Sequence, residues 1–362
     1  MASDKTVIEA AGLVKRYGTF TAVNGVSFNV YEGEIFGLLG PNGAGKTTTM
    51  EMIEGLRKPD GGFARVAGFD TQKQLGQVKE VIGVQLQSTS LFDLLKVREI
   101  VQMYASFYTH TVPIEPLLAD MLLQDKIEGR VKNLSGGQKQ RLAIALALIN
   151  DPKVVFLDEP TTGLDPQARR SLWDIIERLK QQGKTVVLST HYMDEAHVLC
   201  DRICLMDRGE VIALDTPRNL VRSLQSDSAI EFRLPEPVVP EREGTAGQAQ
   251  YAFGQRIVTA AERHGGDAER DALIGRKQTA EPQEGERRRD HTLELLRKVT
   301  AVKQAEQRGD TFVLYTDRLQ ETLTDLVRTA TVHQLQLTDL QTRTATLEDV
   351  FIHMTGRSLR EA

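Results

Sequence analysis

The chain has 362 residues, 40% of them hydrophobic and 26% charged, with a formal net charge of -5. This length allows one large domain with a smaller one, or two medium domains, and the composition is typical of a soluble globular protein. The negative charge excludes a globally basic surface for binding nucleic acid. The sequence contains no run of about 18 apolar residues, so it predicts no membrane span. Because the N-terminus also has no apolar signal-peptide core, we expect the protein to stay in the cytoplasm.

Strand-like and helix-like segments alternate over the first part of the chain. Residues 25–40 read as two strands joined by a turn. Residues 154–159 (VVFLDE) and 185–190 (TVVLST) are continuous apolar runs, as in strands buried on both faces of a parallel sheet. Residues 171–183 between them predict an amphipathic helix, which gives a strand–helix–strand unit. The apolar segment 137–150 predicts a buried helix.

The composition changes after about residue 225. Residues 201–215 still read as two short strands joined at Arg208-Gly209, but residues 235–290 are rich in Glu, Arg, Gln, Gly and Ala. Such a composition favours disorder or a loose surface excursion. Order then returns in segments that read as helix, strand, helix and helix, namely residues 293–299, 311–316, 318–330 and 346–356. We therefore predict a small α+β tail domain interrupted by an insertion.

The chain has only two cysteines, Cys200 and Cys204. One pair in a chain of this length is no disulfide framework. The spacing of four residues would suit two metal ligands on a helix, but no further ligand types cluster nearby. Because RICLMD also reads as a strand, we interpret Cys204 as a small core residue.

The stretch GPNGAGKT, residues 40–47, follows an apolar strand and precedes a segment that reads as a helix. It matches G-x-x-x-x-G-K-[ST], in which glycines let backbone N–H groups turn toward a polyphosphate at a helix N-terminus. Lys46 would supply a cation for the β- and γ-phosphates, and the Thr47 hydroxyl would coordinate Mg²⁺. An ordinary glycine-rich turn with an incidental lysine is the alternative, and the strand–loop–helix context argues against it.

Two acids follow the predicted buried strand 154–158. Asp158 would hold Mg²⁺, directly or through water, and Glu159 would orient or deprotonate an attacking water. The bland alternative is a pair of acids that end the strand or cap the next helix. His191, after the next strand, would donate a hydrogen bond to the γ-phosphate or to developing charge, although a histidine that packs at a strand end is the simpler reading in isolation.

The stretch NLSGGQKQR, residues 133–141, begins the predicted buried helix with a serine and two glycines. A hydroxyl and free N–H groups at a helix N-terminus form a second potential phosphate site. An ordinary serine N-cap explains the same residues, and we would prefer it if the stretch stood alone.

Taken together, these stretches resemble the ATP-binding subunit of an ABC transporter. GPNGAGKT resembles the Walker A loop, LSGGQ the signature motif, VVFLDE the Walker B strand, TGLDP the D-loop and STH the H-loop. The resemblance covers roughly residues 5–225. It implies an α/β P-loop NTPase fold of ABC type: a RecA-like parallel core sheet, an antiparallel β subdomain and an α-helical signature subdomain. A small α+β C-terminal accessory domain over residues 226–362, with a flexible insertion at about 236–290, would follow.

The resemblance also implies roles for individual residues. Tyr17 matches the aromatic that stacks on adenine, and Asp165 matches the D-loop acid that faces the opposite subunit. Gln87 matches the Q-loop glutamine that senses Mg²⁺ and water, with Gln85 as a nearby competitor, because Leu86 replaces the usual proline. The residues expected at ATP are Tyr17, Gly40, Pro41, Asn42, Gly43, Ala44, Gly45, Lys46, Thr47 and Thr48. The residues expected at Mg²⁺ are Thr47, Gln87 and Asp158, those expected in catalysis are Glu159, His191 and Gln87, and those expected at the partner's ATP are Ser135, Gly136, Gly137 and Gln138.

Each motif occurs once in the chain, so the resemblance implies that one chain supplies only half of a complete ATP site. The family packs two domains head to tail, so the resemblance implies a homodimer, or a pair with a close paralogue, and a separate integral membrane permease. The stretch 88–105 matches the region that receives the permease, although a plain surface helix is an equal reading. The ending TATLEDVFIHMTGR resembles exporters of drugs, antibiotics, sodium and polysaccharides, which implies a location on the inner face of the cell membrane and no nucleic acid partner.

Two other classes of function remain at this stage. One is a soluble ABC-type ATPase that acts on a ribosome or DNA without a permease. Such proteins usually carry tandem domains or long coiled coils, and this chain shows neither. The other is a regulatory subunit without turnover, against which the presence of Glu159 and His191 argues.

Overall fold

The computed structural model describes residues 5–87, 91–224, 228–234 and 291–357, which form two compact units. The first unit combines Met1–Asp227 with Thr344–Ala362, and the second is Ser228–Arg343. We expected the tail domain to extend to residue 362, whereas the C-terminal residues group with the first unit. The predicted insertion at about 236–290 lies outside the described residues.

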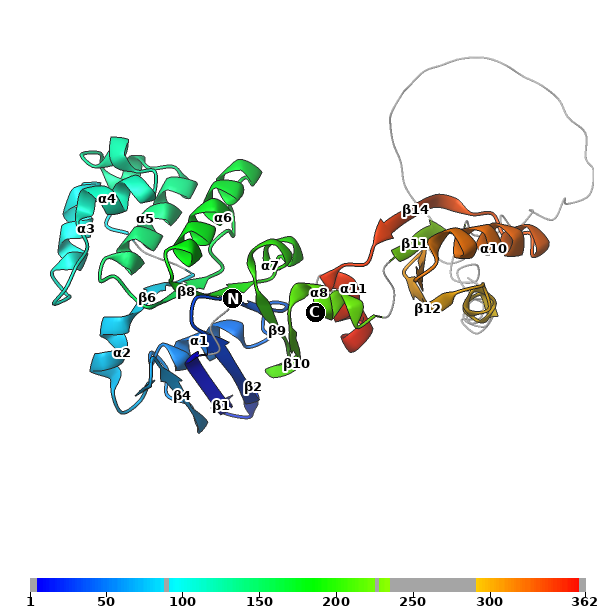
Figure 1. Ribbon diagram of the computed structural model, residues 1–362, viewed down its shortest axis with the longest axis horizontal. Helices are drawn as coiled ribbons and strands as arrows, with labels where there is room; N and C mark the ends of the chain where they lie inside the picture. Colours follow the sequence, from blue (N-terminus) through cyan, green and yellow to red (C-terminus); the bar gives the residue numbers. More distant parts are fainter. Residues whose placement is uncertain (1–4, 88–90, 225–227, 235–290, 358–362) are drawn as a thin grey trace, which may run out of the picture. The chain divides into compact units, whose positions relative to one another are not determined.

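A six-stranded sheet forms the centre of the first unit (Figure 1). Its neighbouring strands pair in parallel, except that the edge strand β10 is antiparallel to β9. Every residue of β3, β7 and β8 is buried, as their continuous apolar sequences predict. The strand order is β10 (Glu210–Asp215), β9 (Arg202–Asp207), β3 (Ile35–Leu39), β8 (Thr185–Thr190), β7 (Val154–Asp158) and β6 (Ile82–Gln85).

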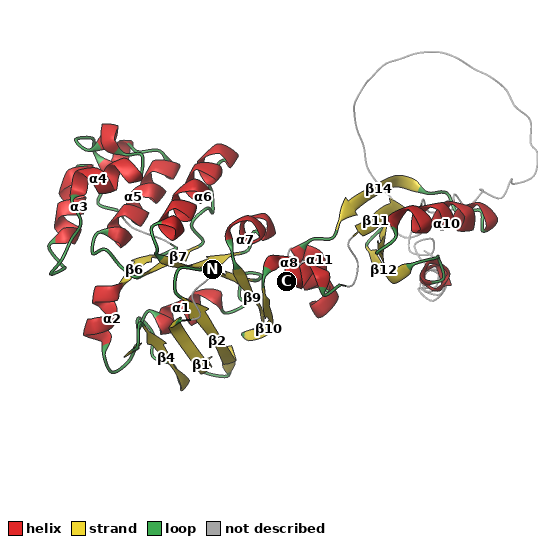
Figure 2. Cartoon of the chain, in the orientation of Figure 1, coloured by secondary structure: helices red, strands yellow, loops and turns green. Residues whose placement is uncertain are grey.

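A four-stranded antiparallel sheet lies beside the central one, and helix α1 (Lys46–Ile53) contacts strands of both (Figure 2). One hydrophobic cluster joins apolar residues of both sheets with Met50, Met52 and Ile53 of α1. This packing holds the start of α1 at the carboxyl end of β3. The antiparallel sheet has the order β2 (Phe20–Tyr31), β1 (Thr6–Tyr17), β4 (Gly61–Val66) and β5 (Phe69–Asp70).

Helices cover the other face of the central sheet. Helix α5 is buried along its second half, from Leu142 to Leu148, which confirms the prediction of a buried helix. Helix α6 begins five residues before the predicted amphipathic segment, because Asp165 caps it and Pro166 occupies its first position. The helices here are α3 (Val97–Ala105), α4 (Ile114–Asp120), α5 (Gly136–Leu148), α6 (Pro166–Gln181) and α7 (Met193–Leu199). Helix α2 (Leu75–Val81) lies on the side of α1, where its Val78 joins the same apolar cluster.

The C-terminal helix α11 (Leu347–Thr355) packs on α7 and on α8 (Pro217–Arg222). Its Leu347, Val350 and Phe351 belong to the same apolar cluster as Ala196 and Leu199 of α7. Arg357, just beyond α11, donates from Nη2 to both carboxylate oxygens of Asp207, at 2.6 and 2.7 Å. These contacts explain why the end of the chain groups with the first unit.

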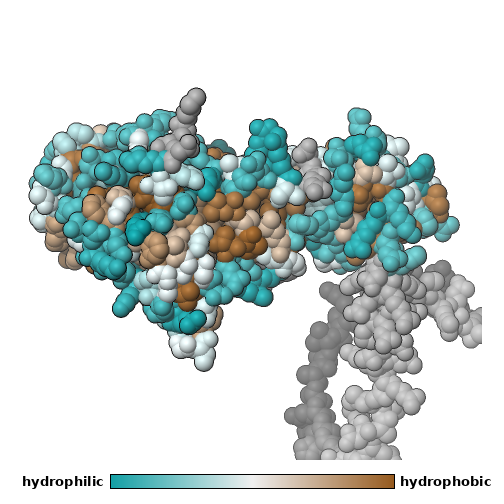
Figure 3. All heavy atoms as spheres, turned by 60° about the horizontal axis from the view of Figure 1, so that its bottom comes forward, coloured by the Kyte–Doolittle hydropathy of each residue, from teal (hydrophilic) through white to brown (hydrophobic). Residues whose placement is uncertain are grey.

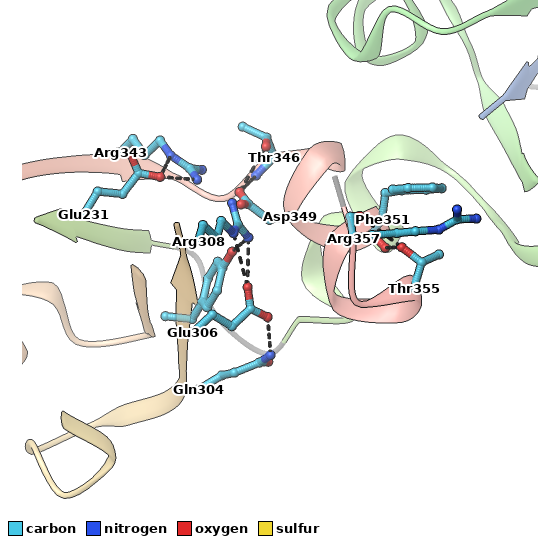
Figure 4. A network of polar contacts seen from close by, with 11 residues as sticks. Glu231, Gln304, Glu306, Arg308, Arg343, Thr346, Asp349, Phe351, Thr355 and Arg357 are labelled. Carbon is cyan, nitrogen blue, oxygen red and sulfur yellow. Dashed lines mark hydrogen bonds and ion pairs between the residues drawn. The ribbon is translucent and has the colours of Figure 1, made fainter. Parts of the chain in front are cut away.

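The second unit is a four-stranded sheet with helix α10 (Leu319–Val332) and a helix over residues 291–297. Leu296, Leu314 and Leu326 are among the residues of its apolar core. Glu231 and Arg343 point toward each other across neighbouring strands, with Nε to Oε1 at 2.8 Å (Figure 4). The strand order is β12 (Val302–Arg308), β13 (Thr311–Thr316), β11 (Ser228–Arg233) and β14 (Thr338–Thr344).

The two cysteines are both buried in the first unit, and Cys204 lies in β9. Burial raises the pKa of Cys204 to about 12, so its thiol stays protonated at neutral pH. Within the described residues, no cluster of three or more His, Cys, Asp or Glu side chains suits a metal ion. The interpretation of Cys204 as a core residue is confirmed.

Apolar side chains also reach the surface. On the face shown in Figure 3 they gather across the middle of the first unit, between polar areas. In the part of the chain that the structure describes, no helix combines the length and the apolar character needed to cross a membrane.

Candidate active site

The loop between β3 and α1 is held by glycines that tolerate no side chain. A Cβ on Gly40 would lie 2.2 Å from the carbonyl oxygen of Met206, so the loop packs directly on the end of β9. Gly45 has a φ of 95° and is the N-cap of α1, and a Cβ there would lie 2.6 Å from the oxygen of Ala22. The left-handed φ and the close approach together require glycine.

Lys46, the first residue of α1, lies over this loop. Its Nζ donates to the carbonyl oxygens of Gly40 and Pro41 at 2.9 and 3.0 Å, and the residue is only 5% exposed. Burial lowers the pKa of Lys46, while the negative charges of Glu159 and Asp158 act in the opposite direction. The loop therefore carries a desolvated cation beside the N-terminus of a helix, which is a strong attractor for phosphate.

Asp158, the last residue of β7, meets the first turn of α1. Thr47 Oγ1 donates to Asp158 Oδ1 at 3.3 Å, and the Ser189 hydroxyl donates to the same oxygen. Burial raises the pKa of Asp158, and the hydrogen bonds from Ser189 and Thr47 offset part of that effect. A carboxylate beside a threonine hydroxyl is an oxygen set that fits Mg²⁺.

Glu159 lies at the centre of the site. Its φ of 46° places a non-glycine residue in the left-handed region, and its N–H donates to Ser189 Oγ at 3.0 Å. The carboxylate accepts hydrogen bonds from Gln87 Nε2 and Thr162 Oγ1, both at 3.2 Å. Lys46 Nζ lies 3.8 Å away. Backbone strain at such a position is typical of functional residues, since the surrounding contacts must hold it in place.

His191 follows β8 and faces Glu159. Its Nδ1 lies 3.3 Å from Glu159 Oε1, and its ring lies 4.1 Å from that of Tyr192. The structure therefore brings His191, Glu159 and Gln87 to one point. The other glutamine, Gln85, is buried in β6 and donates to the backbone oxygen of Leu86 at 2.6 Å. Geometry thus favours Gln87 over Gln85 as the residue that contacts Glu159.

Tyr17 lies at the end of β1 and is 43% exposed. The Arg57 guanidinium lies 5.5 Å from the centre of its ring, and Lys15 Nζ lies at 5.9 Å. The ring is thus accessible to a flat ligand and borders two cations. The position is compatible with the predicted adenine contact.

The second predicted phosphate site is at the start of α5. Ser135 Oγ accepts from the N–H of Gln138 at 3.3 Å, and Gln138 Oε1 accepts from the N–H of Ser135 at 2.9 Å. Asp165 caps α6 in the same way, accepting from the N–H groups of Gln167 and Ala168. A depression of about 250 Å³ lies between these helix starts, lined by Ser135, Gly137, Arg141, Asp165, Gln167, Ala168 and Ser171.

The starts of α5 and α6 make no direct polar contact with the phosphate loop among the described residues. Within the described residues, no hydrogen bond or ion pair links Ser135 or Asp165 to residues 40–47. The chain thus presents two separate anion-attracting features, each built from a helix N-terminus.

Two residues that bind Asp158 and Glu159 were not predicted. Ser189 contacts both acids from the neighbouring strand, and Thr162 donates to Glu159. The signal for Ser189 is a serine near the end of an otherwise apolar strand, a pattern that by itself only suggests that the strand ends there. Its role emerges only from the pairing of Asp158 with Ser189 across β7 and β8.

Comparison with known proteins agrees with this geometry. The family described as ABC transporter matches residues 23–162. The Nod factor export ATP-binding protein I of Burkholderia orbicola (strain AU 1054) is 42% identical over 235 residues, which are 64% of this chain and 77% of that protein. The linearmycin resistance ATP-binding protein LnrL of Bacillus subtilis (strain 168) is 32% identical over 361 residues, covering 98% of this chain and all of that protein (100%).

Solved structures share the fold of the first unit. CbiO1 from Clostridium perfringens, part of the ABC transporter complex CbiONQ, matches 61% of this chain with a TM-score of 0.55 and 27% identity, over 95% of its own length. A dimeric ATP-binding cassette in a post-hydrolysis state, bound to ADP and phosphate, matches 58% of this chain and 98% of its own, with a TM-score of 0.53 and 29% identity.

Proposed function

The chain belongs to the ABC transporter family as an ATP-binding, ATP-hydrolysing subunit, and we propose that it drives export through a separate membrane permease. It would work as a head-to-tail pair with a second copy or a close paralogue. One observation carries the catalytic part of this proposal: Glu159, beside the phosphate loop, contacts Gln87 and His191 and lies next to Lys46.

The binding role follows from residues 40–48. The backbone N–H groups of this loop and the N-terminus of α1 would hold the β- and γ-phosphates, and Lys46 would exchange its contacts with Gly40 and Pro41 for phosphate oxygens. Tyr17 would stack on the adenine. Mg²⁺, held by Thr47 and Asp158 with Gln87 nearby, would neutralise charge on the phosphates when bound.

The hydrolytic role follows from the groups around Glu159. A water beside its carboxylate would attack the γ-phosphorus and give its proton to Glu159, while ADP departs with the bridging oxygen. Gln87 would orient that water, since its side-chain amide already reaches Glu159. His191 would donate a hydrogen bond to the γ-phosphate oxygens as charge develops on them.

We infer the paired arrangement from the two anion-attracting features, the phosphate loop and the start of α5. Ser135, Gly136, Gly137 and Gln138 at the start of α5 would contact the γ-phosphate that the other copy holds. Asp165 would face the other copy beside them. ATP would then favour the closed pair because both copies contact its γ-phosphate, and hydrolysis would remove that preference. The dimeric cassette to which the chain is similar supports this arrangement.

Export and membrane association are supported by the relatives, whose names describe Nod factor export and linearmycin resistance. The segment after Gln87 would receive the permease, because Phe92 and Leu94 are 55% and 73% exposed there. Large apolar side chains exposed in this way mark an interaction surface. We place the protein in the cytoplasm, on the inner face of the cell membrane, without a nucleic acid partner.

Co-purification with a co-expressed candidate permease, a membrane protein of several spans, tests the membrane role. Phe92→Ser should weaken that association by at least about fivefold, since one large apolar anchor is worth about 1 kcal/mol or more. Val332→Ser, which changes a similarly exposed residue of α10 (71%), is the matched control and should leave it unchanged. Equal association of all three proteins would reject this docking surface.

A further inference from the structure

Glu195 is a fully buried acid that the proposed mechanism does not use. It lies on α7, four residues after His191, with 0% of its surface exposed. Its Oε1 accepts a hydrogen bond from Trp173 Nε1 of α6 at 3.1 Å, whereas its Oε2 is buried without a hydrogen-bond partner. Burying a carboxylate of which one oxygen accepts no hydrogen bond is costly in free energy, so the position of Glu195 needs an explanation.

The surroundings of Glu195 connect two loops of the active site. Burial raises its pKa, and the hydroxyls of Thr190 and Thr161, together with Trp173 and Arg169, act against that rise. Thr190 immediately precedes His191, and Thr161 lies two residues after Glu159. The Thr161 hydroxyl is itself buried without a hydrogen-bond partner, and it lies close enough to the carboxylate to favour its ionised form.

Helix α6 holds the same loop at a second point. The Arg169 guanidinium lies 4.3 Å from the centre of the Tyr192 ring, and that ring packs on His191. Arg169 and Trp173 are four residues apart, so they share one face of α6. The helix begins at Pro166, directly after its cap Asp165, the acid expected to face the partner subunit. Helix α6 therefore connects Asp165 with both contacts beside His191. Arg169 contacts Tyr192, and Trp173 contacts Glu195.

We propose that Glu195 is a positioning residue that couples the Asp165 end of α6 to His191. Through Trp173 it ties α6 to α7, and through Thr190 and Thr161 it faces the two segments that carry His191 and Glu159. When the partner engages Asp165, a shift of α6 would move Arg169 and Trp173 together and set His191 against the γ-phosphate. This inference rests on the proposed function, because it assumes that His191 acts during hydrolysis.

Steady-state ATPase kinetics of the full chain provide the first test. Glu195→Ala should lower kcat by about tenfold or more and change KM for ATP by less than about twofold, since misplaced catalytic groups lose rate before they lose binding. Glu195→Gln should restore most of kcat, because its amide oxygen can accept from Trp173 and its amide nitrogen can donate to Thr161. Glu34→Ala is the control, since Glu34 is also buried but lies at the opposite end of β3 from the phosphate loop. It should lower stability without lowering kcat.

Fluorescence gives an independent readout, because Trp173 is the only tryptophan of the chain. In the Glu159→Gln protein, ATP with Mg²⁺ should shift the Trp173 emission, whereas ADP should not. Adding Glu195→Ala should abolish the ATP-induced shift while calorimetry still measures ATP binding. An unchanged kcat in Glu195→Ala, failure of Glu195→Gln to restore it, or emission that is insensitive to ATP would overturn the inference. Absence of turnover in the unmodified chain would instead reject the proposed function.

Discussion

The ammonium of Lys46 lies 3.8 Å from the carboxylate oxygen Oε1 of Glu159, and both side chains are more than nine-tenths buried. These residues come from the phosphate loop and from the end of β7, which are far apart in the sequence. At such depth each charge strongly affects the other, because little water screens them. A substitution of Lys46 or Glu159 therefore changes the electrostatic environment of the other residue. A variant separates ATP binding from hydrolysis only if it keeps the charge of one of the two, as Glu159→Gln keeps that of Lys46.

Lys46→Ala should weaken ATP binding itself. A hydrogen bond to a charged group contributes about 1.5–3 kcal/mol, so the Kd for ATP should rise by at least about tenfold, as measured by calorimetry. Lys73→Ala is the control, because Lys73 has an exposed side chain (83%) and lies outside the loop. ATP affinity and hydrolysis that match the unmodified protein in Lys46→Ala would show that this loop does not hold the nucleotide.

Ser135→Ala should separate capping from partner recognition. Ser135 and Thr216 both cap a helix by accepting from a backbone N–H, at 3.3 and 3.2 Å, so replacing either with alanine should lower stability by about 1 kcal/mol. Only Ser135→Ala should also lower ATP turnover, by about tenfold or more, because only Ser135 is expected at the partner's γ-phosphate. Thermal unfolding and phosphate release report the two effects. Equal loss of turnover in Thr216→Ala would assign the effect to the fold alone.

Glu54, at the end of α1, should make the protein less stable as pH rises. Burial, followed by the nearby charges of Asp158 and Glu51, raises the pKa of Glu54 from 4.5 to about 8. Between these values the folded chain keeps a proton that the unfolded chain releases, so the free energy of unfolding falls by up to about 1.4 kcal/mol per pH unit. Below about pH 4.5 the Glu54 carboxyl is protonated in both the folded and the unfolded chain, so it no longer makes the stability depend on pH.

The matched variants for this pH effect are Glu54→Gln and Glu51→Gln. Urea unfolding at pH 5 and pH 8 should show a smaller loss of stability in Glu54→Gln than in the unmodified protein. Glu51→Gln, which removes a neighbouring charge but not the burial of Glu54, should keep most of the original dependence, because burial is the largest cause of the raised pKa. A pH dependence that Glu54→Gln leaves unaltered would mean that this carboxyl is ionised in the folded chain.

The fold of the first unit could be predicted where the sequence pattern and burial agree. The strands β3, β7 and β8 are apolar throughout because they are buried on both faces, so their sequences mark them clearly. The strands β12 and β14 of the second unit carry many polar residues, such as the run TDLQTRT in β14, whose residues are almost all exposed. They were not predicted, because only pairing with neighbouring strands identifies them.

The active site could be predicted as far as local motifs reach. The phosphate loop and the acids after β7 are contiguous in sequence, and their chemistry follows from spacing. The choice between Gln85 and Gln87 and the contacts of Ser189 depend on how strands pair, which no spacing reveals. Glu195 shows the same limit, since its hydrogen bond to Trp173 joins residues on different helices.

The most direct measurement is the mass of the Glu159→Gln protein in solution, by light scattering, with ATP or ADP and Mg²⁺. Loss of the general base should reduce phosphate release by about 100-fold or more while ATP still binds. With ATP the mass should be twice that of the 40.3 kDa chain, and with ADP it should be that of one chain. A 40.3 kDa particle saturated with ATP, or one that hydrolyses it at the rate of the unmodified protein, would contradict a site completed by a second copy.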